Sequence, residues 1–180
     1  MSTDNPALLG QLGRHRWTVP LIAALAERKG ARFVELLALL STNRESLTRT
    51  LDGVAQNGWV MRNPGHGHPL RPEYILTEAG WAIAPLCTGI EDVRKAVGLA
   101  PASLSRWSLP VIRCIDQGTH RFAGIERGIS DSNPRALTQS LKSLVGQQLV
   151  TRTILDDYPP APEYWLSQSG SRMAAVLAGA

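Results

Sequence analysis

The side chains with the clearest chemical potential in this sequence are hydrogen-bonding groups suited to nucleic acid, and they lie in two polar stretches ninety residues apart. The first stretch contains Arg49, and the second contains Gln139 at the equivalent position. An arginine can donate two hydrogen bonds to guanine, and a glutamine amide can pair with adenine in the same two-point manner. The two positions therefore predict recognition of base edges, with a different base at each. For any single residue, a solvated side chain on a surface helix is an equally good interpretation.

Helical periodicity indicates which residues of each stretch face outward. If Leu47, Leu51 and Val54 are buried, a rotation of 100° per residue turns Arg49 to solvent, together with Glu45, Asp52 and Gln56. The start of each helix adds free N–H groups and the positive end of the helix dipole, which favour a phosphate. The helix residues predicted to contact DNA are Asn43, Arg44, Thr48, Arg49, Asn133, Arg135, Thr138, Gln139 and Lys142.

A predicted β-hairpin follows each stretch, and the two hairpins differ in charge. The first offers four candidate phosphate contacts, Arg62, His66, His68 and Arg71. The second keeps Arg152 but has Asp156 and Asp157 near its tip. Because carboxylates repel phosphates, the second tip is expected not to contact the DNA backbone.

Both stretches belong to an internal repeat that covers most of the chain. Arg16-Trp17-Thr18-Val19-Pro20-Leu21-Ile22 returns ninety residues later as Arg106-Trp107-Ser108-Leu109-Pro110-Val111-Ile112. Leu47-Thr48 returns in the same way as Leu137-Thr138. Such self-similarity indicates one structural unit written twice. Arg32-Phe33 meets Arg121-Phe122 at a spacing one residue shorter, which places a one-residue deletion and its recovery in loops.

The same order of elements is predicted in both copies: two helices, a capped third helix, a hairpin and a closing helix. A short helix at 6–12 precedes the first copy, and 98–103 is the predicted joint. This order is that of a winged helix-turn-helix, whose third helix enters the major groove while the hairpin, or wing, lies beside it. The sequence therefore predicts an α+β, mostly helical protein with two tandem winged helix-turn-helix domains, at 1–97 and 98–180.

The matching residues resemble the HxlR-type winged-helix regulators of bacteria. That family begins with a basic residue and Trp, as in Arg16-Trp17 and Arg106-Trp107, and continues with the Arg-Phe and Leu-Thr steps given above. The family's wing exit resembles Pro69-Leu70-Arg71-Pro72-Glu73-Tyr74-Ile75-Leu76-Thr77 and, in the second copy, Pro159-Pro160-Ala161-Pro162-Glu163-Tyr164-Trp165-Leu166-Ser167. The resemblance implies a cytoplasmic, DNA-binding transcription regulator of a kind that usually acts as a homodimer of one-domain chains.

Three features depart from the family pattern. The chain carries two domains, and Ala161 stands where the family's wing arginine would be. The N-terminal cysteine of redox-sensing members is also missing, since Cys87 and Cys114 fall in predicted helices. Thiol sensing is therefore not expected, and buried, inert cysteines are the better interpretation.

Composition and motifs limit the other functions. The net charge of +4 and pI of about 9.5 permit contact with a polyanion. Neither a signal peptide nor an apolar run long enough to span a bilayer is visible, so a soluble, cytoplasmic protein is expected. His66 and His68 lack a third ligand in the sequence, so we predict no metal and no cofactor. No catalytic arrangement of residues stands out, and an enzyme is not predicted.

These observations favour a pseudo-dimer within one chain that binds double-stranded DNA at two unlike half-sites. The alternative is an interaction module that kept the fold and binds another regulator or RNA polymerase. A homodimer of the full chain stays open. So does a small-molecule effector, for which Trp59, Trp81 and Trp165 are candidate lining residues, whereas Trp17 and Trp107 are expected in the cores.

Overall fold

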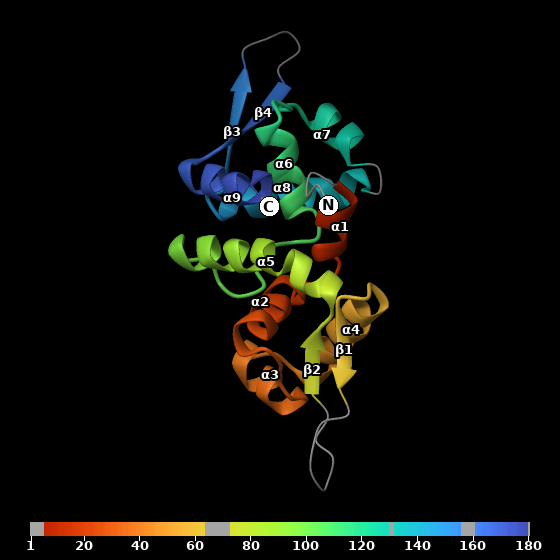
Figure 1. Ribbon diagram of the computed structural model, residues 1–180. Helices are drawn as coiled ribbons and strands as arrows, with labels where there is room; N and C mark the ends of the chain where they lie inside the picture. The colour runs from red at the N-terminus through yellow and green to blue at the C-terminus, as the bar shows by residue number, and fades with distance from the viewer. Residues whose placement is uncertain (1–5, 64–72, 130–131, 156–160, 180) are drawn as a thin grey trace, which may run out of the picture. The chain divides into compact units, whose positions relative to one another are not determined.

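The computed structural model describes residues 6–63, 73–129, 132–155 and 161–179 (Figure 1). The chain divides into two compact units. One unit is His15–Asp92, and the other joins the residues up to Arg14 with Val93–Ala180. The predicted domain boundary at residue 97 stays a prediction, because compact packing and repeat boundaries need not coincide.

The unit His15–Asp92 has the predicted order of elements (Figure 1). It contains α2 (Thr18–Arg28), α3 (Phe33–Leu40), α4 (Arg44–Gln56), β1 (Val60–Asn63), β2 (Glu73–Leu76) and most of α5 (Glu78–Ala96). Its core is aliphatic: Leu21, Leu36 and Leu47 from the three helices are each fully shielded from solvent. Burial of such side chains is the main favourable term in folding, and it fixes the phase of α4.

The other unit repeats this plan with α6 (Ser108–Asp116), α7 (Phe122–Gly128), α8 (Pro134–Gly146), β3 (Val150–Leu155), β4 (Ala161–Leu166) and α9 (Gln168–Ala178). It also receives α1 (Pro6–Leu12), which packs against α6. Leu9 and Leu12 of α1 are buried, and a side chain on Gly13 would lie only 2.0 Å from the Arg106 carbonyl oxygen. Residues 6–14 are therefore an added layer on the second copy.

The two hairpins share one register. Val60 pairs with Leu76 and Arg62 with Tyr74; ninety residues on, Val150 pairs with Leu166 and Arg152 with Tyr164. These features confirm the predicted α+β, mostly helical class with two winged helix-turn-helix domains. None of the described helices is both long enough and apolar enough to cross a membrane.

Each closing helix approaches its hairpin at a glycine. A Cβ on Gly80 would lie 2.0 Å from the Trp59 carbonyl oxygen, and a Cβ on Gly170 would lie 2.0 Å from that of Leu149. The same two carbonyls accept hydrogen bonds from the backbone N–H groups of Thr77 and Ser167 at 3.0 Å. Only glycine allows this close approach, which explains why it stands at both repeat positions.

Candidate nucleic-acid interface

The third helix of each copy begins at an asparagine cap. The Asn43 side-chain oxygen accepts a hydrogen bond from the Ser46 N–H at 2.8 Å, and Asn133 does the same for Ala136. Pro134 occupies the first turn of α8, where a missing N–H costs little. The caps define the starts of α4 and α8, and both asparagines are exposed.

The predicted helix phase agrees with the exposure of the side chains. On α4, Arg44, Thr48 and Arg49 are exposed, whereas Leu47, Thr50, Leu51 and Val54 are buried. On α8 the exposed side chains are Arg135, Thr138, Gln139 and Lys142. The structure thus brings the predicted helix residues onto one open face in each copy, and contact of these residues with DNA stays a prediction.

The cations of α4 already have partners within their own unit. Arg49 forms an ion pair with Glu45 one turn earlier, and both side chains are largely exposed. The Arg44 guanidinium lies over the Phe33 ring, 5.8 Å from its centroid. This contact joins the start of α4 to α3. The four exposed charges of α4 are two basic and two acidic, because Asp52 faces outward as well.

Each hairpin carries one described arginine on the strand that follows α4 or α8. Arg62 on β1 and Arg152 on β3 are both exposed. Predicted wing residues His66, His68 and Arg71 lie outside the described residues, as do Asp156 and Asp157 of the second tip. The described part of each wing therefore contributes one arginine.

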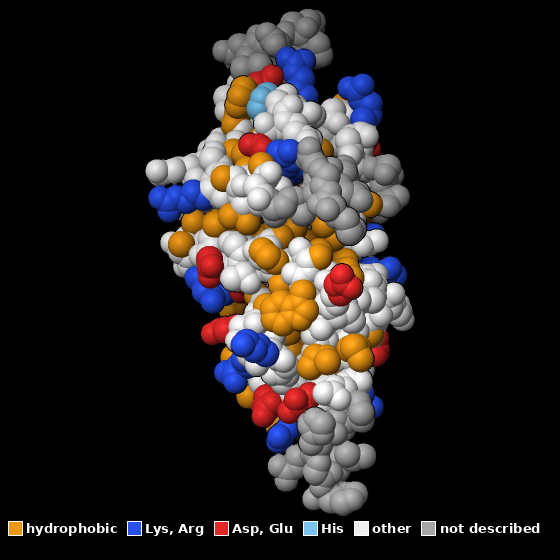
Figure 2. All heavy atoms as spheres, viewed as in Figure 1, with side chains coloured by type: hydrophobic (Ala, Val, Ile, Leu, Met, Phe, Trp, Pro, Cys, Tyr) orange, Lys and Arg blue, Asp and Glu red, His pale blue; other side chains and the backbone are white. Residues whose placement is uncertain are grey.

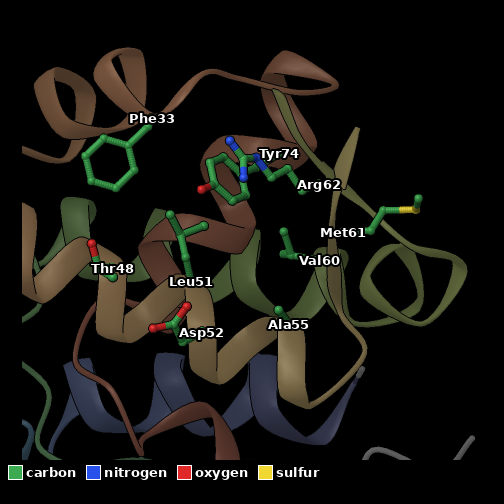
Figure 3. Close-up of a pocket in the computed structure, with 9 residues that line it drawn as sticks. All are labelled: Phe33, Thr48, Leu51, Asp52, Ala55, Val60, Met61, Arg62 and Tyr74. Atoms are coloured by element: carbon green, nitrogen blue, oxygen red, sulfur yellow. The ribbon is translucent and has the colours of Figure 1, made fainter. Parts of the chain in front are cut away.

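A pocket of about 250 Å³ lies between α4 and the first wing (Figure 3). Thr48, Asp52 and Ala55 of α4 line one side, and Arg62 and Tyr74 of the hairpin line another. An acid and a base thus share this pocket. Neither Trp59 nor Trp81 belongs to its lining, so the predicted effector site at the tryptophans gains no support.

The tryptophans differ between the copies. Trp107 is buried as predicted, whereas Trp17 is only half-buried. Trp81 and Trp165 are 46% and 44% exposed, and Trp165 stacks on His120 with ring centroids 3.6 Å apart. Core packing therefore accounts for Trp107 and Trp59 and not for the other three.

In each copy an ion pair that the sequence analysis did not predict joins the hairpin to the residue just before α3 or α7; we call this pair the wing brace. Arg32 forms an ion pair with Glu73 at 3.7 Å, and Arg121 pairs with Glu163 at 3.4 Å. In the first copy the Ala31 and Tyr74 backbones also exchange hydrogen bonds, at 3.1 and 2.9 Å. The sequence does hold a sign of this ion pair, because its arginine and its glutamate belong to the Arg-Phe and Pro-Glu-Tyr steps, which both recur in the repeat.

Neither cysteine is placed for thiol chemistry. Burial, and to a lesser degree Glu91, raise the pKa of the Cys87 thiol, and burial raises the pKa of the Cys114 thiol. Both thiols are therefore poor nucleophiles at neutral pH. In the described ranges there is no group of three potential metal ligands among His, Cys, Asp and Glu. On the face shown in Figure 2, basic and acidic side chains are interspersed.

Comparison with known proteins supports the resemblance inferred from the repeat. A profile of the HxlR-like helix-turn-helix family matches residues 12–98 and again 104–179. No solved structure matches the chain.

Three curated relatives illustrate the similarity. The chain is 31% identical over 74 residues to YtfH of Escherichia coli (strain K12), an uncharacterized HTH-type transcriptional regulator; the match covers 41% of this chain and 59% of that protein. It is 31% identical over 72 residues to an uncharacterized HTH-type transcriptional regulator of Methanothermobacter thermautotrophicus, covering 40% and 55%. It is 29% identical over 72 residues to another such protein, YvaP of Bacillus subtilis (strain 168), covering 40% and 67%.

Proposed function

Because the chain belongs to the HxlR-like helix-turn-helix family, we propose that it is a transcription regulator that binds double-stranded DNA in a sequence-specific manner. The observation that carries the proposal is the pair of capped helices, α4 and α8, each with exposed polar side chains beside an arginine-bearing hairpin. An α-helix fits the major groove, where base edges present a distinguishable pattern of donors and acceptors. A cytoplasmic location follows from this role.

The two winged helices act as a pseudo-dimer within one chain. Helix-turn-helix dimers bind half-sites about 34 to 36 Å apart, one turn of DNA. Arg49 and Gln139 occupy equivalent repeat positions and suit different bases, so the operator consists of two unlike half-sites. The starts of α4 and α8 and the wing arginines Arg62 and Arg152 bind phosphates.

Selection of bound duplexes from a random pool, run beside a mass measurement in solution, tests this proposal. The expected result is a non-palindromic site bound by a single chain, with an affinity that falls steeply as salt is raised. A perfect palindrome bound by a monomer would contradict the unlike half-sites. A stable dimer of full chains would replace the pseudo-dimer with an assembly of four winged helices.

One observation favours a second function, that of a module binding another regulator or RNA polymerase. The outer side of α3 exposes Val34 and Leu39, which are 66% and 42% accessible. Exposed apolar side chains on one helix suit a protein partner better than DNA. A shift assay at low salt with random and genomic duplexes separates the two functions, since an absence of retardation would favour the module.

A further inference from the structure

The exposed charges of the two recognition helices are arranged differently. Helix α4 has two basic and two acidic side chains, whereas α8 has Arg135 and Lys142 and no acid. The difference is concentrated at two repeat positions. At the spacing of ninety, Glu45 of α4 corresponds to Arg135 of α8, and Asp52 corresponds to Lys142. All four side chains are exposed, so the exchange from acid to base changes the surface and leaves the core untouched.

One acid of α4 is paired with a cation, and the other shares a pocket with one. Glu45 is in an ion pair with Arg49, the candidate base-reading residue. Asp52 lines the same pocket as the wing residue Arg62 (Figure 3). The Glu45 carboxylate competes with a phosphate for the Arg49 guanidinium, and both carboxylates repel a nearby phosphate.

In α8 the two corresponding positions carry basic side chains in place of the acids. Asn133 caps α8, Arg135 lies in its first turn, and Lys142 occupies the repeat position of Asp52. The helix N-terminus and the two exposed cations of α8 therefore combine with the same sign, although Asp156 and Asp157 give the wing beyond Arg152 the opposite one.

We propose that the two copies divide the work of binding, an inference that rests on the proposed function. Helix α8, through Arg135 and Lys142, attracts the DNA backbone more strongly than helix α4 does. Glu45 and Asp52 keep the affinity of helix α4 for the DNA backbone low. Arg49 leaves Glu45 only for a site that replaces the ion pair with two fixed hydrogen bonds, as a guanine does.

This division has a mechanistic consequence for specificity. A recognition helix that binds any phosphate strongly gains little from the correct base, whereas a helix whose arginine is already paired discriminates more sharply. The chain therefore binds its asymmetric operator in one orientation, with α8 as the anchor and α4 as the discriminating half.

Two matched double variants of the full chain test the proposal, with affinity measured against KCl on a random-sequence duplex and on a selected operator. Arg135→Gln with Lys142→Gln should weaken binding to both duplexes by about tenfold or more, and the slope of log affinity against log salt should fall by about two. Glu45→Gln with Asp52→Asn should tighten binding to the random duplex by about tenfold and narrow its difference from the operator.

Control variants separate a local effect from one of net charge. Glu27→Gln with Asp92→Asn makes the same change in charge as the α4 variant, and Lys95→Gln with Arg172→Gln matches the α8 variant; all four residues are exposed and lie outside α4 and α8. Each control should change affinity by less than about threefold. Thermal melting of every variant shows whether the fold is kept.

The outcomes distinguish this proposal from the function on which it rests. If the wild-type chain binds no duplex at low salt, the proposed function fails and the inference fails with it. If the wild-type chain binds but the α4 variant gains no affinity, or gains no more than its control, only the division of work is overturned. The same holds if the α8 variant binds as the wild type does.

Discussion

The segment that precedes the first helix of each copy contacts the recognition helix through different chemistry. In the second copy, Ser105 Oγ lies 2.8 Å from Ser108 Oγ and 2.8 Å from Ser140 Oγ on α8. In the first copy, His15 takes the place of Ser105 and packs against Gly53 of α4, where a Cβ would come within 2.5 Å of the His15 Nε2 atom. A hydroxyl network and a ring over glycine thus hold equivalent helices in equivalent places.

The two copies have the same backbone plan and the same hairpin register, although different side chains pack against α4 and α8. The fold therefore does not dictate the side-chain chemistry of the copies. The acid-to-base differences on the outer faces of α4 and α8 are therefore not by-products of packing. They are free to serve function, and this is where the two copies should be compared by experiment.

The largest expected effect is on stability, and it should be equal in the two copies. Gly80→Ala or Gly170→Ala would force a carbonyl to leave its backbone hydrogen bond, because the new Cβ would lie 2.0 Å from that oxygen. We expect a loss of about 3 kcal/mol in each case, the upper end of overpacking costs. Thermal melting should show it.

Gly146→Ala is the matched control, because nothing lies within 4 Å of the added Cβ. It should be neutral or slightly stabilising. A Gly80→Ala chain that melts like the wild type would contradict the close approach of α5 to the strand.

The next largest effect is on sequence specificity, and it should fall on a different base pair for each copy. Arg49→Ala should relax one position of the operator and Gln139→Ala a different one, each at a cost of about 1 to 3 kcal/mol on the best site. Repeating the duplex selection with each variant measures this. Uniform weakening on all sequences would instead mark the residue as a phosphate contact.

A smaller effect should come from the helix caps and should again be shared. Asn43→Ala and Asn133→Ala each remove the acceptor for one backbone N–H, and we expect a loss of about 1 kcal/mol from either. Urea unfolding measures it. The Asn→Asp variants keep an acceptor and should be close to wild type; if they lose as much as the alanine variants, capping is not the role of these side chains.

The smallest effect concerns the wing braces and should differ slightly between copies. The Arg32–Glu73 pair has both side chains about 40% exposed, whereas Glu163 in the second pair is only 16% exposed. Arg32→Gln should cost well under 1 kcal/mol, and Arg121→Gln somewhat more, because a pair in a less solvated place is less screened. A larger loss from Arg32→Gln in urea unfolding would reverse this ranking.

The sequence predicted the parts of the structure that depend on local pattern. The repeat, the apolar spacing of Leu47, Leu51 and Val54, and the asparagine caps were sufficient for the order of elements and for the outward face of α4. They were sufficient because each rests on neighbours within one or two helical turns.

The remaining features depend on contacts between distant residues. The Arg32–Glu73 and Arg121–Glu163 braces join residues about forty positions apart, and their ion-pair geometry has no periodic signature. Trp17 is only half-buried, although its repeat partner Trp107 is buried. Helix α1 adds a layer near Trp107, since a Cβ on Gly10 would lie 3.6 Å from the Trp107 ring. Equivalent repeat positions therefore predict the backbone position of a residue better than the neighbours that its side chain contacts.

The packing of α1 on α6 also sets an order of events during synthesis. Helix α1 ends at Leu12, and its partner begins at Ser108, so the ribosome must add about a hundred residues before the two can meet. At roughly 5 to 20 residues per second, that is a delay of about 5 to 20 seconds. During this time the apolar side chains of Leu9 and Leu12 have no native partner, while the His15–Asp92 unit can already fold. The nascent chain therefore carries α1 as an unpaired apolar segment until α6, Ser108–Asp116, has emerged.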